Sequence, residues 1–311
     1  MNKNLLYIFT FLFFSCQSLG LNNKKIIDHK VWNKGAMVSA ANPYAVKAAI
    51  AILEKGGSAT DAAIAAHLVL GLVEPQSSGL GGGGFMLNYD FKTNGLTFID
   101  GRETAPSSAK IDMFMKDDGT VMSFMEAVPS GKAVGTPGIV ALYETAHKAY
   151  GLLPWSILFE DAINLSKNGF IVSPRLAKYV DFAEKRGRLS KNPLTKKYFY
   201  PNDVKIQSGD LLKNPEYANT LETIAKEGSI AFYNSNIAKE IVTAVNADPH
   251  PGGMTLEDLK NYNTVLRPVI CGPFRNMKIC TTSPPSSGGA QIMIAGLYDQ
   301  LINNESNELN I

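Results

Sequence analysis

The residues best suited to chemistry lie in the stretch 73–106, where a glycine-rich loop, Gly79–Gly84, precedes an arginine, Arg102, at the end of an expected strand. Glycine has no Cβ and tolerates positive φ, so such a loop lets a ligand or another strand approach its backbone closely. A guanidinium beside it can bind a small carboxylate through two hydrogen bonds. The spacing alone slightly favours a simpler interpretation, an ion pair of Arg102 with Glu103 or Asp100.

Three other kinds of site fit the sequence poorly. Gly79–Gly84 matches the pattern GxGxxG, but a dinucleotide site needs a strand before the glycines and a helix after them, whereas here a helix precedes and a hairpin follows. The nucleophile pattern GxSxG is absent. The four histidines are scattered and no CxxC pair exists, so we expect no metal site.

Two helices and a hairpin are expected to position the loop and the arginine. Asn42-Pro43 is typical of a helix start and predicts a helix through Lys55, after a short strand at Gly35–Ala40. Ser58 and Asp61 form a capping-box pattern before a second helix, Ala62–Val73, which is so apolar that most of its surface should be buried. His67 on that helix is interpreted as a core residue, not a ligand.

The hairpin and the later elements follow from turn signals and apolar periodicity. Strands are expected at Phe85–Phe91 and Leu96–Asp100, with Asn94-Gly95 as a tight turn. Residues 187–216 are basic and interrupted by prolines, which predicts a surface segment. The other expected elements are helices at Gly138–Tyr150, Trp155–Asn168, Pro174–Arg186, Ala218–Glu227, Ile237–Asn246 and Ala290–Ile302, a capped turn at Thr255, and a hairpin of Val265–Cys271 with Met277–Thr282.

Composition indicates an ordinary globular protein that is exported. The chain has 311 residues, 45% of them hydrophobic, and a net charge of +2, so charge gives no reason to expect a nucleic-acid partner. Residues 1–20 have the pattern of a signal peptide, with an apolar run at Leu5–Phe14 that is too short to span a bilayer. Ser15-Cys16 resembles a bacterial lipoprotein signal, in which Cys16 would carry lipid; an ordinary cleaved signal is the equal alternative. Residues 21–34 are expected to form a polar leader.

Export permits disulfide bonds, and Cys271 and Cys280 flank a probable hairpin turn. Two buried free thiols are an equally good interpretation, because free cysteine is among the most buried residue types. The sequence leaves both open.

Several segments together resemble one family. EPQSSGLGGGGFML, IDGRETAP, VGTPGIVALYETAHKAYG, MTLEDLKNY and PPSSGGAQ, in this order between about Gly35 and Ile302, are similar to the large-subunit portion of gamma-glutamyltranspeptidases. The resemblance implies a mixed α/β fold of the N-terminal-nucleophile hydrolase type, an αββα sandwich, which residues 35–311 would form only in part. It also implies an exported precursor, periplasmic or membrane-anchored, that cleaves itself into a large and a small subunit.

In this family, the resemblance implies, the N-terminal threonine of the small subunit attacks the γ-carbonyl of glutathione or a related compound. Water or an amino acid then accepts the γ-glutamyl group, and no cofactor takes part. The arginine of GRETAP, here Arg102, would hold the α-carboxylate of that group.

The chain departs from the family pattern in one respect. In the family the catalytic threonine follows PPSSGG, in a Thr-Thr-His-type motif. In this chain Thr281-Thr282 precede PPSSGG and are followed by Ser283, so they are not that motif. We therefore expect these 311 residues alone to be inactive, to need the missing small subunit as a partner, and to be unstable because strand edges and an apolar face are uncovered. A related acylase of β-lactam side chains and a non-catalytic exported scaffold protein are the alternatives.

Overall fold

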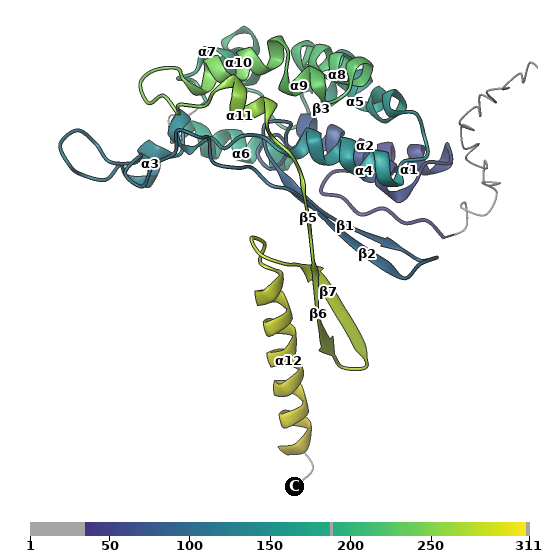
Figure 1. The fold of residues 1–311 in the computed structure, drawn as a ribbon. Coiled ribbons are helices and arrows are strands. Elements are labelled where there is room, and N and C mark those ends of the chain that lie inside the picture. Colours follow the sequence, from purple (N-terminus) through teal and green to yellow (C-terminus); the bar gives the residue numbers. More distant parts are fainter. Residues whose placement is uncertain (1–34, 187–188, 309–311) are drawn as a thin grey trace, which may run out of the picture. The chain divides into compact units, whose positions relative to one another are not determined.

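The computed structural model describes residues 35–186 and 189–308 as a mixed α/β fold (Figure 1). The expected signal peptide, the leader and Cys16 lie outside the described residues. No helix in the described part of the chain is both long and apolar enough to cross a membrane.

The first two helices form where the local signals predict them. Helix α1 runs over Pro43–Glu54, and the Asn42 side chain accepts a hydrogen bond from the Tyr44 amide at its start. Helix α2 runs over Ala59–Val73 and begins with the predicted capping box, in which Ser58 and Asp61 exchange hydrogen bonds. The two helices pack against each other, and most of α2 is buried, as its composition predicts.

The central hairpin is also present, but its turn differs from the expected one. Strand β1 (Gly84–Asp90) pairs antiparallel with β2 (Gly95–Gly101), with Gly84 opposite Gly101. Asn94 has a positive φ of 53°, but Gly95 already belongs to β2, so residues 91–94 lie between the strands instead of the expected 92–95. Asp90 stabilises this turn, because its carboxylate accepts hydrogen bonds from the Lys92 amide and the Thr93 hydroxyl, both at 2.9 Å.

The expected strand Val265–Cys271 is wrong in its extent. Pro268 divides it into β5 (Val265–Arg267), which pairs with β2, and β6 (Val269–Phe274), which pairs with β7 (Met277–Thr282). Proline lacks the amide hydrogen that a continuous ladder needs, so the chain changes sheet at this residue. The short strand expected at Gly35–Ala40 is also wrong, because these residues are assigned to no strand.

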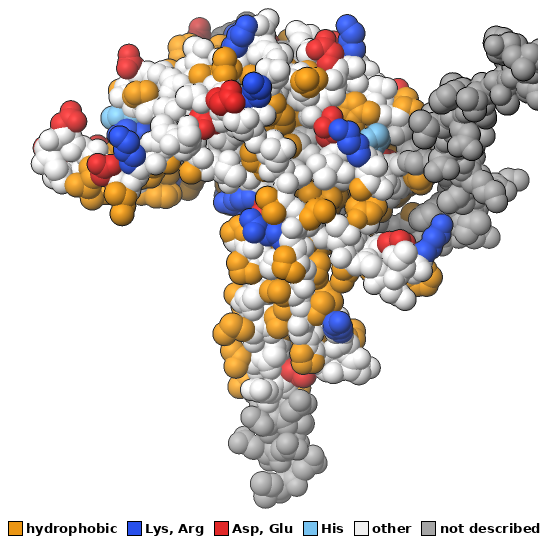
Figure 2. Space-filling model, viewed as in Figure 1, with side chains coloured by type: hydrophobic (Ala, Val, Ile, Leu, Met, Phe, Trp, Pro, Cys, Tyr) orange, Lys and Arg blue, Asp and Glu red, His pale blue; other side chains and the backbone are white. Residues whose placement is uncertain are grey.

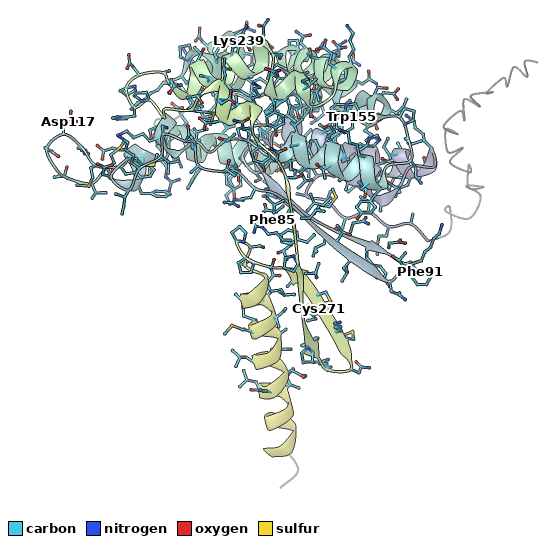
Figure 3. The ribbon with its side chains drawn as sticks, viewed as in Figure 1. Phe85, Phe91, Asp117, Trp155, Lys239 and Cys271 are labelled. Carbon is cyan, nitrogen blue, oxygen red and sulfur yellow. A yellow bond between two sulfur atoms is a disulfide. The ribbon has the colours of Figure 1, made fainter. Side chains whose placement is uncertain are left out.

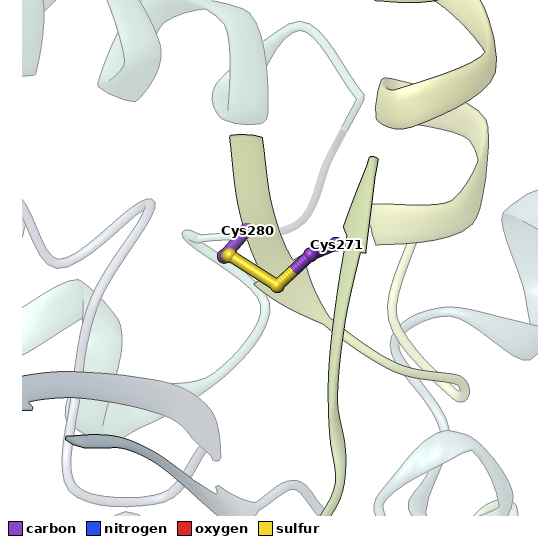
Figure 4. The surroundings of a disulfide bond; sticks show 2 residues. All are labelled: Cys271 and Cys280. Carbon is purple, nitrogen blue, oxygen red and sulfur yellow. A yellow bond between two sulfur atoms is a disulfide. The ribbon is translucent and has the colours of Figure 1, made fainter. Parts of the chain in front are cut away.

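Cys271 and Cys280 form a disulfide bond across β6 and β7, with their Cα atoms 4.1 Å apart (Figures 3 and 4). Helix α12 (Gly288–Glu308) packs against this hairpin. The absence of a side chain at Gly272 makes room there for Ile292 of α12. Of the two interpretations of the cysteines, the structure therefore has the disulfide.

Helices make up most of the remainder, and α4 (Ile139–Tyr150) packs between α2 and the strands β1 and β2. The expected helix Trp155–Asn168 is divided into a 3-10 turn, η3 (Trp155–Phe159), and α5 (Glu160–Asn168); the Trp155 indole donates a hydrogen bond to the Ile224 carbonyl. The other helices are α3 (Phe124–Ala127), η2 (Gly131–Ala133), α6 (Pro174–Glu184), α8 (Pro215–Glu227), α9 (Ile230–Tyr233), α10 (Asn236–Val245) and α11 (Leu256–Lys260).

Residues 189–216 are more ordered than the expected surface segment. They contain α7 (Pro193–Phe199), the 3-10 turn η4 (Pro201–Asp203) and β4 (Leu211–Leu212), which pairs with β3 (Phe170–Ile171). Ile206 and Leu212 are buried in the core. The many lysines and prolines of this region dominate its composition, so the sequence did not reveal that Ile206 and Leu212 are buried.

Candidate functional site

Arg102 directly follows β2, and its side chain is 62% exposed. Its Nε atom lies 3.0 Å from Oε2 of Glu103, which is the ion pair that the spacing favours. That oxygen is buried and accepts no hydrogen bond within the described residues, so charge attraction holds the pair. An exposed ion pair of this kind contributes little stability, about 0–1 kcal/mol, which leaves the guanidinium available to a stronger carboxylate partner.

The backbone of Arg102, in contrast, is held on both sides. Its amide donates a hydrogen bond of 2.8 Å to Oδ1 of Asp100, and its carbonyl accepts one of 2.6 Å from the hydroxyl of Tyr262. Asp100 is buried, and its Oδ2 lies 2.5 Å from Nε of Arg267 on β5. Sequence reasoning missed Arg267 and Tyr262, because no local signal links residues that are more than 150 positions apart in the chain.

The glycine loop contacts another segment of the backbone through the carbonyl of Gly82. The carbonyl of Gly82 accepts hydrogen bonds from the amides of Gly138 and Ile139, at 2.9 and 3.1 Å. These amides lie at the N-terminus of α4, where an anion would otherwise bind. The carbonyl of Gly82 therefore caps the N-terminus of α4.

Three glycines allow the segments around Arg102 to touch. A Cβ on Gly83 would lie 2.6 Å from both the Glu103 amide nitrogen and the Gly101 carbonyl oxygen. A Cβ on Gly101 would lie 2.5 Å from Cβ of Leu142, and one on Gly138 would collide with the Tyr262 hydroxyl. Gly79 and Gly81, by comparison, face open space. The loop thus has one crowded end, against Arg102, and one open end.

A buried carboxylate anchors the start of the loop. Glu74 accepts hydrogen bonds from the Asn42 amide group at 2.8 Å and from the Gln76 amide group at 2.5 Å, and Nε of Arg175 lies 3.4 Å away. These partners come from the N-terminus of α1, the loop itself and the start of α6. Glu74 therefore fixes the loop to two helices.

A cavity of about 380 Å³ adjoins the chain just beyond Arg102. Its lining residues come from the segment after β2, from Thr136, which pairs with Thr104, and from α11 with the loop that follows it: Thr104, Ala105, Ser107, Thr136, Glu257, Asp258, Asn261, Tyr262 and Asn263. Burial, followed by the charges of Asp100 and Glu103, raises the pKa of Tyr262 to about 12, so its hydroxyl stays protonated at neutral pH.

His67, predicted as a core residue, is partly buried. One of its ring nitrogens, Nδ1, is hydrogen-bonded to the hydroxyl of Tyr143, and burial lowers the pKa of His67. No group of three or more histidine, cysteine or acidic side chains within residues 35–186 and 189–308 is arranged to hold a metal ion.

The chain is similar to one family along most of its length. Residues 45–310 match the family model described as gamma-glutamyltranspeptidase. The chain is 39% identical over 257 residues to the glutathione hydrolase proenzyme of Bacillus subtilis (strain 168), which covers 82% of this chain and 43% of that relative.

Two solved structures are similar in fold as well. The gamma-glutamyltranspeptidase of Helicobacter pylori is 35% identical with a TM-score of 0.76, over 82% of this chain and 73% of that one. The transpeptidase enzyme CapD of Bacillus anthracis is 34% identical with a TM-score of 0.72, over 88% of this chain and 86% of that one.

Proposed function

Because the chain belongs to the gamma-glutamyltranspeptidase family, we propose that it is part of an enzyme that cleaves the γ-glutamyl amide of glutathione and related compounds. The γ-glutamyl group passes to water or to an amino acid or peptide. The matched residues span 43% of the length of the Bacillus subtilis relative, and the proposal concerns the activity of a whole protein of that kind. The observation that carries the proposal to a particular residue is Arg102, an exposed guanidinium on a firmly held backbone beside an open glycine loop.

In the proposed mechanism, Arg102 binds the α-carboxylate of the γ-glutamyl group through charge-assisted hydrogen bonds. A threonine outside these 311 residues, at the N-terminus of the small subunit, attacks the γ-carbonyl; the γ-glutamyl amide bond breaks, the donor's amine leaves with a proton, and a γ-glutamyl ester remains. Its own α-amine serves as the base, and backbone amides stabilise the oxyanion. Water or an amine then attacks the ester and releases the threonine.

These 311 residues alone are expected to show no γ-glutamyl transfer, because no Thr-Thr-His-type motif follows PPSSGG among them. The measurement is release of the aniline from a γ-glutamyl anilide by the purified chain and by a longer precursor that contains it. Activity of the short chain would contradict the prediction. A precursor that prefers glutaryl β-lactams would support the acylase, and an inert precursor the scaffold protein.

We further propose that the remainder of the precursor covers an apolar face on α12, and that the sheets β1-β2-β5 and β6-β7 then contribute to the layers of an αββα sandwich. Met293, Ile294, Leu297, Tyr298 and Leu301 share one side of α12 and are exposed (Figure 2). Exposure of five large apolar side chains on one face to water is unfavourable in free energy, so such a face favours association.

The isolated chain is therefore expected to associate in solution, and Leu297→Glu to reduce this association. Light scattering over a range of protein concentrations measures it. Leu194→Glu is the matched control, since Leu194 is equally apolar and exposed but lies on α7. A monomeric parent chain with a sharp, cooperative thermal transition would show that the face needs no cover.

Export of the protein to the periplasm, with or without a lipid on Cys16, is part of the same proposal. Its support is the disulfide between Cys271 and Cys280, a bond typical of oxidising compartments. Cell fractionation tests it, since recovery of the protein in the cytoplasm would contradict export. Loss of membrane attachment in Cys16→Ala would separate a lipoprotein from a protein with an ordinary signal.

A further inference from the structure

We propose that Tyr262 is a positioning residue for substrate binding, which acts by holding the carbonyl of Arg102 so that the guanidinium meets the donor's carboxylate. This inference rests on the proposed role of Arg102. It concerns a residue from a different part of the chain, the loop after α11.

Arg102 is held through its backbone. Among the described residues its side chain has one weak ion-pair partner, the adjacent Glu103, so the place from which the guanidinium reaches out is set by the backbone. Asp100 fixes the peptide on the amino side and Tyr262 the peptide on the carboxyl side, at 2.8 and 2.6 Å. Asp100 belongs to β2 itself, whereas Tyr262 ties this strand end to a separate part of the fold.

Tyr262 is in turn held in place. Its ring is stacked on that of Tyr233, with the centroids 5.8 Å apart and the planes at 5°. Tyr233 is buried, and its hydroxyl donates to the Pro137 carbonyl at 3.0 Å and accepts from the Ala141 amide at 3.2 Å. The two tyrosines therefore connect Arg102 to the first turn of α4.

The space for the Tyr262 hydroxyl is reserved. Any side chain on Gly138 would collide with it, and Gly138 also donates its amide to the glycine loop. Because the hydroxyl stays protonated well above neutral pH, it remains a donor under all ordinary assay conditions. Its contact with Arg102 is thus a permanent part of the site.

The test uses the complete precursor after its cleavage and compares Tyr262→Phe with the parent. Phenylalanine keeps the stacked ring and removes one hydroxyl. We expect KM for a γ-glutamyl donor to rise about three- to tenfold, the effect of one lost hydrogen bond, with kcat within about twofold. A donor that lacks the α-carboxylate should have an unchanged KM.

The matched control is Tyr217→Phe, which also removes a tyrosine hydroxyl that donates to a backbone carbonyl, that of Leu68 at 2.9 Å. This variant should leave KM unchanged. A double-mutant cycle completes the test, because Tyr262→Phe should have no further effect on KM in the Arg102→Ala background.

Three outcomes would overturn the inference: an unchanged KM in a folded Tyr262→Phe variant, an equal rise for the donor without the α-carboxylate, or additive effects in the cycle. Failure of the proposed function gives a different result, since the parent precursor itself would then release no γ-glutamyl group.

Discussion

Arg102→Ala in the complete enzyme is expected to raise KM for γ-glutamyl donors by roughly 30-fold to several thousandfold. The basis is the loss of a charge-assisted contact to a desolvated carboxylate, which costs about 2 to 5 kcal/mol. Steady-state kinetics with a γ-glutamyl anilide measures the effect. The fold should be unaffected, because the Arg102 side chain is largely exposed and contacts Glu103 alone through an ion pair.

Two further variants sharpen this result. Arg102→Lys keeps the charge but loses the two-pronged geometry, so it should recover only part of the affinity. Arg186→Ala is the control: it removes another arginine, one whose guanidinium lies over the Phe182 ring, and should leave KM for γ-glutamyl donors unchanged. The assigned role fails if Arg102→Ala has the kinetic constants of the parent.

Asp61→Ala is expected to cause the largest loss of stability, on the order of 3 to 5 kcal/mol. Asp61 is fully buried, and one of its oxygens accepts hydrogen bonds from the amides of Ser58, Leu152 and Leu153 at 2.9, 2.8 and 3.2 Å. Alanine would leave these donors without that acceptor inside the protein. The carboxylate thus joins the start of α2 to the segment after α4.

The urea midpoint of unfolding, followed by the fluorescence of Trp155, measures this loss. Trp155 is a local reporter, because its ring packs 5.3 Å from that of His147, which itself lies 3.7 Å from Asp61. Glu126→Ala is the matched control: it removes the acidic residue of another capping box, that of α3, but in solvent. A midpoint shift in Asp61→Ala no larger than that of the control would refute the account.

The sequence predicted those elements whose signals are local. Asn42 with Pro43 and Ser58 with Asp61 start α1 and α2 as expected, since a cap needs only residues within one turn. The wrong expectations have different causes. The turn after β1 is stabilised by a local side-chain contact, that of Asp90 with Lys92 and Thr93, whereas the division of one strand into β5 and β6 depends on which distant partner each half finds.

The candidate site was predictable to the same degree. Arg102 is recognisable from its place beside the glycines and from the resemblance of GRETAP to a family motif. Tyr262 ends MTLEDLKNY, another of the family-like segments, but nothing in that segment says that its hydroxyl reaches Arg102, and Arg267 lies in none of these segments. Only the folded chain brings them to the end of β2.

Gly83, Gly101 and Gly138 have a consequence for which substitutions the protein can accept. At each of these positions a methyl group would meet backbone or side-chain atoms of the segments that surround Arg102. Alanine is a mild replacement at most positions, but here its methyl group would displace the segments around Arg102 and so shift the arginine indirectly. Genetic variants that impair this site are therefore expected to include glycine-to-alanine changes, which add a single carbon atom. The site depends on the absence of side chains at these glycines as much as on the charge of Arg102.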